Sequence, residues 1–340
     1  MKKIIGIVSL AFIFSMCSTE IELLEDWKET CIVYGLLDQT QPKQYVRIQK
    51  AFLGPDNALN MAQQYDSINY VNTLDVKIEQ IFNGNVINVY TLTPDTFYNK
   101  QSGDFFSPMQ VIYSFDTPSG LLDNCSYHLV ITNNQTGNVC ESTTNIVEDF
   151  SITSPQGPSV SFIKPNQSTR VEVKWGGAPS ARLYQLAMYF NYFETDINNV
   201  TTSKVTPPWI IGEVSTTTTT ANGTQSIKFD PDGFYRFISQ QIPQDNSVSV
   251  RESGYVEFVV YACGEQLKTY MEINGPSSGL AQEKPVYTNI TNGLGVFSGR
   301  TVANKSPLTL TNQSIDSLSY GRFTCPLKFK DRNGIVIGCQ

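Results

Sequence analysis

The sequence predicts a mainly β protein with two β-sandwich-like domains and one or two short helices in the second. Several segments alternate apolar and polar residues with the period of two that is typical of strands with one buried face. The clearest runs from Asp75 to Phe82 and is followed by the turn-forming pair Asn83-Gly84. A Ser/Pro/Gly-rich stretch, residues 151–158, then interrupts the pattern, and we interpret it as a linker between a domain over residues 31–150 and one over residues 159–340.

The first domain begins with two predicted strands, Cys31 to Leu36 and Tyr45 to Gln49. In the hairpin at Asn83-Gly84, a type I′ turn would pair Ile81 with Val86 and Ile78 with Val89. A second hairpin is expected between Tyr127 to Thr132 and Val139 to Ile146. Residues 31–150 therefore read as a run of antiparallel strands.

The second domain opens with a clean alternation that places Val171, Val173 and Trp175 on one face. This pattern is typical of an early strand in an immunoglobulin-like or fibronectin-like sandwich, and we expect Trp175 in the core. Helical segments are predicted at Phe234 to Gln241 and Glu265 to Met271.

The first 17 residues have the pattern of an export signal. Lys2 and Lys3 precede an apolar run from Ile4 to Met16, which is too short to span a bilayer as a helix. Cys17 follows directly and resembles the acylated cysteine of a bacterial lipoprotein, so residues 1–16 would be a cleaved signal peptide. Fatty acyl chains such as palmitate on Cys17 would anchor the protein to a membrane.

Met16 departs from this pattern, in which Gly, Ala or Ser normally precedes the cysteine, and an ordinary secretory peptide is the alternative. Residues 17–30 are polar and acidic, and we interpret them as a tether. Beyond Cys17 no apolar segment approaches 18 residues. The mature chain is therefore expected to be tethered to a membrane without spanning it.

The protein is acidic. Its formal charge of −7 becomes −9 when Lys2 and Lys3 are removed, and its pI is near 4.9. A net negative charge opposes binding to polyanions, so nucleic acid is not an expected partner.

Six cysteines remain after Cys17, and an oxidising compartment permits disulfides between them. Cys325 and Cys339 flank the turn-like residues 331–334 and are the best candidate for a bridge. Cys125 and Cys140 are not expected to be bonded, because Cys140 would lie opposite Ile131. The alternative is that the cysteines are buried free thiols. No spacing suggests a zinc site.

The sequence contains no catalytic or cofactor-binding motif that we can identify. His128 is the only histidine, and no nucleophile signature such as GxSxG accompanies it. Phosphate-loop, dinucleotide and HExxH patterns are missing. Asp230-Pro231-Asp232-Gly233 lacks the carboxylates of a full calcium loop and is interpreted as a turn. We therefore expect no cofactor, no bound metal and no enzymatic activity.

The segment from Asn289 to Gly299, with Gly293, Gly295 and Phe297, carries a resemblance to a known family. It is similar to the closing "NI-x-NGLG-F" region of an uncharacterised Bacteroidota outer-membrane lipoprotein family, catalogued as a domain of unknown function. The lipid cysteine and the first strands, at Val33 to Leu36 and Val46 to Ile48, fit as well. The three glycines are expected to serve turns and close packing near the end of the second domain.

Members of that family are often encoded beside TonB-dependent transporters. The resemblance implies a lipid-anchored, non-enzymatic binding accessory at the outer membrane, with a transporter as a partner. It leaves open whether the protein faces the periplasm or the cell surface. An adhesin or fimbria-like subunit is the structural alternative, and it would need a donor strand, which we do not expect because Gln340 closely follows the predicted hairpin. A surface glycoside hydrolase is the enzymatic alternative, because paired carboxylates meet only in space.

Replacement of Cys17 by serine should release the protein from membranes or leave an unprocessed precursor, because serine offers no thiol for acylation. Metabolic labelling with a fatty acid, followed by membrane fractionation, measures this. Persistent lipid labelling of the variant would show that the anchor lies elsewhere.

Overall fold

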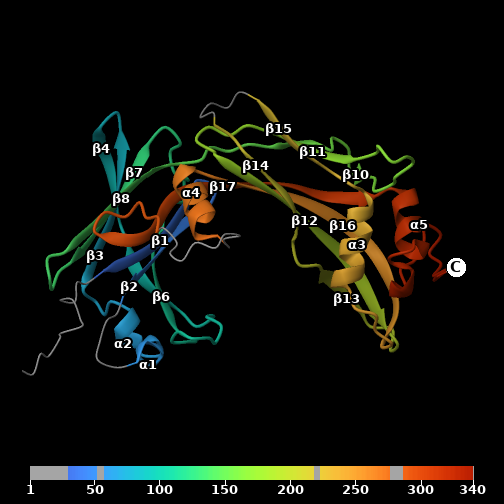
Figure 1. Cartoon of the computed structure of the whole chain (residues 1–340), viewed down its shortest axis with the longest axis horizontal. Coiled ribbons are helices and arrows are strands. Elements are labelled where there is room, and N and C mark those ends of the chain that lie inside the picture. Colours follow the sequence, from blue (N-terminus) through green and yellow to red (C-terminus); the bar gives the residue numbers. More distant parts are fainter. Residues whose placement is uncertain (1–29, 52–56, 218–222, 276–285, 340) are drawn as a thin grey trace, which may run out of the picture.

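The computed structural model describes residues 30–51, 57–217, 223–275 and 286–339 and is mainly β (Figure 1). The predicted signal peptide over residues 1–16, Cys17 and all but the last residue of the tether lie outside the described residues. Figure 1 shows two lobes joined by long strands.

The first lobe contains eight strands and two short helices in sequence order. These are β1 (Cys31–Asp38), β2 (Lys43–Lys50), α1 (Ala58–Ala62), α2 (Tyr65–Ile68), β3 (Leu74–Phe82), β4 (Asn85–Thr91), β5 (Thr93–Phe97), β6 (Gln110–Asp116), β7 (Ser126–Asn133) and β8 (Val139–Asn145).

The remaining elements include three unusually long strands. They are β9 (Ile152–Ser154), β10 (Ser159–Val160), β11 (Val171–Gly176), β12 (Leu183–Asp196), β13 (Thr201–Val205), β14 (Trp209–Ser215), β15 (Thr224–Phe229), α3 (Asp232–Gln241), β16 (Val248–Cys263), α4 (Glu265–Asn274), β17 (Gly293–Leu310), α5 (Asn312–Tyr320) and the 3₁₀ helix η1 (Cys325–Leu327).

A ten-stranded sheet connects the two lobes. Its main path is β13-β12-β16-β17-β1-β2-β6-β5, with β14 beside β12 and β10 beside β17. The first half of β17 pairs in parallel with β1, and its second half pairs antiparallel with β16. Two smaller sheets, β4-β3-β7-β8 and β15-β11-β9, face the large sheet.

Each lobe has its own hydrophobic core between two sheets, so both are sandwich-like. The first core packs β1, β2 and β6 against β3 and β7, with Val33, Ile48, Ile78 and Leu129 almost fully buried. The second core packs β12, β16 and β17 against β11 and β15, and α3 and α5 add side chains to it. Trp175 is fully buried there, as the alternation in its strand predicts.

Both cores lie on the same face of the ten-stranded sheet. Successive side chains on a strand point to opposite faces. Along β17, Phe297 belongs to the first core and Ala303 to the second, and these positions are an even number of residues apart in a regular stretch. The opposite face of the sheet carries α4, whose Leu267 backbone N–H donates to the Ser298 hydroxyl. We call this second side the open face.

The chain passes from the first core to the second at two places, and these differ from the expected boundaries. Ile146 lies in the first core and Val147 in the second, a few residues before the expected end of the first domain. Ile152, within the expected linker 151–158, is buried in β9. Ile290 and Phe297, expected in the second domain, lie in the first core because β17 extends the sheet of that lobe beyond β1.

The two crossings touch at Gly299. A Cβ atom built there would lie 2.4 Å from the Asn145 carbonyl oxygen and 3.0 Å from the Val147 nitrogen. The Thr144 hydroxyl accepts a hydrogen bond from the Gly299 N–H at 3.1 Å. Only glycine allows two backbones to approach this closely.

The predictions for individual turns, strand pairs and helices are confirmed in part. Asn83 and Gly84 both have positive φ, as a type I′ turn requires, and Ile81 pairs with Val86. The expected pairing of Ile78 with Val89 is wrong, because the register shifts by one residue between Gln80 and Ile81, so that Ile78 faces Tyr90. Helices α3 and α4 form where predicted. The second lobe also contains α5 and the 3₁₀ helix η1, which the sequence did not predict.

Gly299→Ala should lower the free energy of unfolding by about 3 kcal/mol, because the new methyl group overlaps backbone atoms that cannot rotate away. Gly212→Ala in β14 is the matched control, since its nearest atom would be Ile227 Cδ1 at an ordinary 3.6 Å. Urea unfolding of the two variants measures the difference. Equal losses in both would contradict a special role for Gly299.

Candidate functional site

The glycine-rich residues 289–299 form the seam between β17 and β1. The Asn289 side chain accepts from the Phe297 N–H at 3.0 Å and donates to the Phe297 carbonyl oxygen at 2.7 Å. Phe297 is fully buried against Gly35, where a Cβ would lie 2.8 Å from its ring. Gly295 has φ +111°, and a Cβ there would lie 1.9 Å from the Val33 oxygen. Gly293, level with Cys31 on β1, is similarly crowded. This segment is structural, and it packs in the first lobe.

Cys325 and Cys339 are joined by a disulfide, with their Cα atoms 4.8 Å apart. The pairing of the two cysteines is as predicted, but the expected hairpin between them does not form. Cys325 lies in η1, and residues 331–334 form a turn without flanking strands. The Asp331 carboxylate holds that turn by accepting from the backbone N–H groups of Asn333 and Ile335. Cys125 is outside any disulfide, and Cys140 faces Ile131, as the register predicts.

His128 lies on the outer side of the four-stranded sheet between two carboxylates. Its Nδ1 is 3.2 Å from Glu79 and its Nε2 is 3.9 Å from Glu141. Glu79 is its direct cross-strand partner on β3. A hydrogen bond between directly opposed side chains supports strand pairing modestly, and this accounts for the contact between His128 and Glu79.

The open face contains two adjacent hollows that we name together the junction groove. One, of about 150 Å³, lies between α4 and the sheet and is lined mainly by apolar side chains, among them Leu183, Leu267, Met271 and Val302. The other, of about 320 Å³, lies over β1 and β2 beside Tyr34, Lys43 and Tyr45. Leu36 and Arg300 line both hollows, so the groove crosses the junction between the lobes.

Charged groups in the junction groove are only partly neutralised. Arg300 has a half-exposed side chain, and its Nε is 3.8 Å from a carboxylate oxygen of the buried Asp38. Lys43 lies 3.0 Å from Asp95, and their hydrogen bond raises the pKa of the lysine. Arg300 is therefore a cation at the centre of the groove with a distant partner.

Tyr261, Tyr270 and Cys263, in or beside the groove, stay protonated at neutral pH. Tyr270 donates to the Tyr34 hydroxyl at 3.2 Å, and this bond together with burial raises the pKa of Tyr270 to about 12. Burial raises the pKa of Tyr261 to about 12, with Tyr189 contributing, and that of the Cys263 thiol to about 12. Because the thiolate is the reactive form, Cys263 is a poor nucleophile here. The groove offers neutral polar groups, aromatic rings and the cations Arg300 and Lys43, which suits binding.

The groove was not expected from the sequence, although β1 contains a signal for it. Its segment Cys31 to Leu37 is apolar or aromatic at almost every position and does not alternate. Such a strand is typically covered on both faces. Val33 and Leu37 enter the first core, whereas Tyr34 and Leu36 line the groove.

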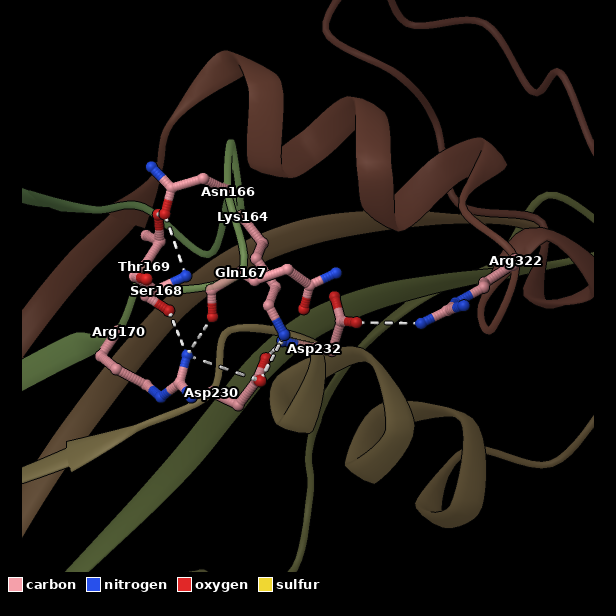
Figure 2. A network of polar contacts seen from close by, with 9 residues as sticks. All are labelled: Lys164, Asn166, Gln167, Ser168, Thr169, Arg170, Asp230, Asp232 and Arg322. Carbon is pink, nitrogen blue, oxygen red and sulfur yellow. Dashed lines mark hydrogen bonds and ion pairs between the residues drawn. The ribbon is translucent and has the colours of Figure 1, made fainter.

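The Asp230 to Gly233 segment forms the expected turn and also organises a polar network at the far end of the second lobe (Figure 2). Asp230 accepts from Lys164 and lies 3.9 Å from Arg170, and the bond from Lys164 lowers the pKa of this carboxylate. Asp232 is bonded to Arg322 at 2.9 Å.

Two further findings concern metals and membranes. Within residues 30–51, 57–217, 223–275 and 286–339, no group of three or more His, Cys, Asp or Glu side chains is placed to hold a metal ion. No helix in this part of the chain has the length and apolar character needed to cross a bilayer.

No family model matches this chain. No curated protein matches it either. Among solved structures, it shows a similarity to the C-terminal globular domain of the oligosaccharyltransferase from Pyrococcus abyssi, at 12% identity and a TM-score of 0.20. That alignment covers 59% of this chain and 39% of the other, so the chain spans well under half of its length. A similarity of this size carries no inference about fold or function.

Removing the disulfide with the double change Cys325→Ser and Cys339→Ser should lower the free energy of unfolding by up to about 3 kcal/mol, because a loop of roughly 15 residues is released in the unfolded chain. Urea unfolding with and without reductant measures it, and reductant should not affect the variant. A non-reducing peptide map of the native protein that shows two free thiols would contradict the bridge.

Proposed function

We propose that this protein is a non-enzymatic lipoprotein, anchored in the outer membrane through Cys17, that acts as a binding accessory to a TonB-dependent transport system. The export signal, the cysteine that follows it and the resemblance of residues 289–299 to an outer-membrane lipoprotein family support the location.

The observation that carries the binding role is the junction groove. Both lobes contribute to it, so its shape depends on the complete fold and is held by a rigid sheet. Tyr34 and Tyr45 are exposed to about two fifths on the open face, and Arg300 is half exposed. Tyrosine and arginine are the side chains most enriched at energetic centres of protein interfaces. We therefore assign the open face to docking on the transporter.

Pull-down from detergent-solubilised outer membranes tests this proposal. The wild-type protein should recover a TonB-dependent transporter, and Tyr34→Ala or Arg300→Ala should reduce the recovery about tenfold or more, as truncation of an interface centre does. Phe82→Ala is the matched control, because its ring has 39% exposure, close to the 40% of Tyr34, and lies at the end of β3 in the four-stranded sheet. Equal recovery with all four proteins would overturn the docking face, and turnover of a glycan by the purified protein would overturn the non-enzymatic assignment.

A further inference from the structure

The outer edge of β4 is an unpaired strand edge in the first lobe. This strand ends the sheet order β4-β3-β7-β8, and no strand of the described residues pairs with its other side. Figure 1 shows β4 on the side of the first lobe that faces away from the second. Six of its seven residues are exposed. The row of backbone N–H and C=O groups along such an edge is a template for another strand.

Backbone donors of β4 point toward this open edge. The Leu92 N–H, directly after β4, donates to the Val76 carbonyl oxygen of β3 at 2.9 Å. Because N–H groups alternate in direction along an antiparallel strand, those of Val89 and Thr91 point away from β3. The Val89 N–H donates instead to the side-chain oxygen of Asn88 at 3.0 Å. This local bond takes the place that a carbonyl group of a further strand would fill.

The sequence of β4 lacks the features by which natural edge strands avoid pairing. Charged residues, especially lysine, and proline are the usual ones. In this chain β5 contains Pro94, β13 contains Lys204 and β15 contains Lys228. The sequence of β4 is NVINVYT, with neither a charge nor a proline. The register shift lies toward the turn of the hairpin, so residues 88–91 keep a regular pairing with β3.

Apolar side chains of β4 are exposed beside the open edge. Val86, Ile87 and Val89 are each about half exposed. Val89 lies opposite Glu79, whose carboxylate contacts His128 on the outer side of the four-stranded sheet. Exposed apolar side chains that gather on one strand mark a surface that another protein covers.

A second copy of β4, running antiparallel, fits this edge. With a two-fold axis at Val89, the two Val89 residues exchange N–H···O bonds, and Ile87 faces Thr91 of the second copy. The Glu79 carboxylates of the two copies are then three strand spacings or about 14 Å apart, beyond the Debye length of about 8 Å at physiological salt. The chain has a formal charge of −7, so two copies repel over most of their surface. An uncharged strand is where they approach at the least cost.

We propose that two copies of this protein pair through β4 as a two-fold dimer, in which their four-stranded sheets join into one continuous sheet. The junction groove lies on the open face of the large sheet, which this pairing does not involve. The inference is therefore independent of the proposed accessory role, and each copy keeps its docking face accessible.

Sedimentation velocity of the purified full chain tests the inference without any transporter, so its failure is distinct from failure of the pull-down. One pair of short strands buries less than a standard interface of about 1,600 Å², so we expect a reversible dimer with a Kd of roughly 10 to 100 μM. Samples below and above this range should change from monomer to dimer. A monomer at every concentration would overturn the inference.

Val89→Lys should raise this Kd about tenfold or more, because two like charges would face each other at the axis. Val89→Pro removes the N–H that points to the edge and should do the same. Proline is tolerated on an edge strand where the N–H faces solvent, so this variant is expected to fold. Ser203→Lys, on the exposed edge strand β13, is the matched control and should associate like the wild type. Equal association of the wild type and both Val89 variants would place the contact elsewhere and refute the pairing through β4.

Val89→Cys tests the register of the pairing. Residues that exchange hydrogen bonds across an antiparallel pair have Cα atoms about 5.5 Å apart, which is within reach of a disulfide. Mild oxidation should give a covalent dimer on a non-reducing gel, whereas Ser203→Cys should stay monomeric. If the chain is monomeric and instead recovers a different protein from membranes in a manner that Val89→Lys abolishes, the edge belongs to that protein and the inference is wrong.

Discussion

The backbone contact at Gly299 is the constraint on which the rest of the structure depends. At this point β17 leaves the first core, and the segment from Asn145 to Val147 passes from the first core to the second beside it, in the same direction along the chain. A side chain at position 299 would separate the two crossings. The contact is reinforced on the open face, where the Gly264 N–H donates to the Gly299 carbonyl oxygen at 3.0 Å and starts α4 directly above the junction. Placement of the lobes and of α4 therefore follows from one close approach.

A shared sheet also separates the two faces of the molecule by chemistry. Side chains on one face of the large sheet are buried in the two cores. Only its other face can therefore contact a partner along both lobes. Its groove contains protonated hydroxyls and a protonated thiol beside Arg300, groups that can form hydrogen bonds but are poorly suited to attack a substrate.

Much of the fold could be predicted because its signals are local. Alternation of Val171, Val173 and Trp175 identifies a strand and its buried face without any knowledge of the partner strand. Asn83-Gly84 specifies its turn through the positive φ angles that these residues tolerate. The register beyond the turn was less predictable, since no residue pattern in the hairpin marks the shift between Gln80 and Ile81.

The sequence by itself determined the mainly β class, the main hairpins, two of the helices and the pairing of Cys325 with Cys339, because each depends on residues close together in the chain. It also marked residues 289–299 as a special segment. Only the tertiary structure decided that this segment completes the first core, since Phe297 meets Gly35 across 262 positions and no local pattern encodes a parallel pairing between such distant strands. The junction groove arises in the same way. Arg300 and Leu36 become neighbours only after long-range packing has brought their strands together.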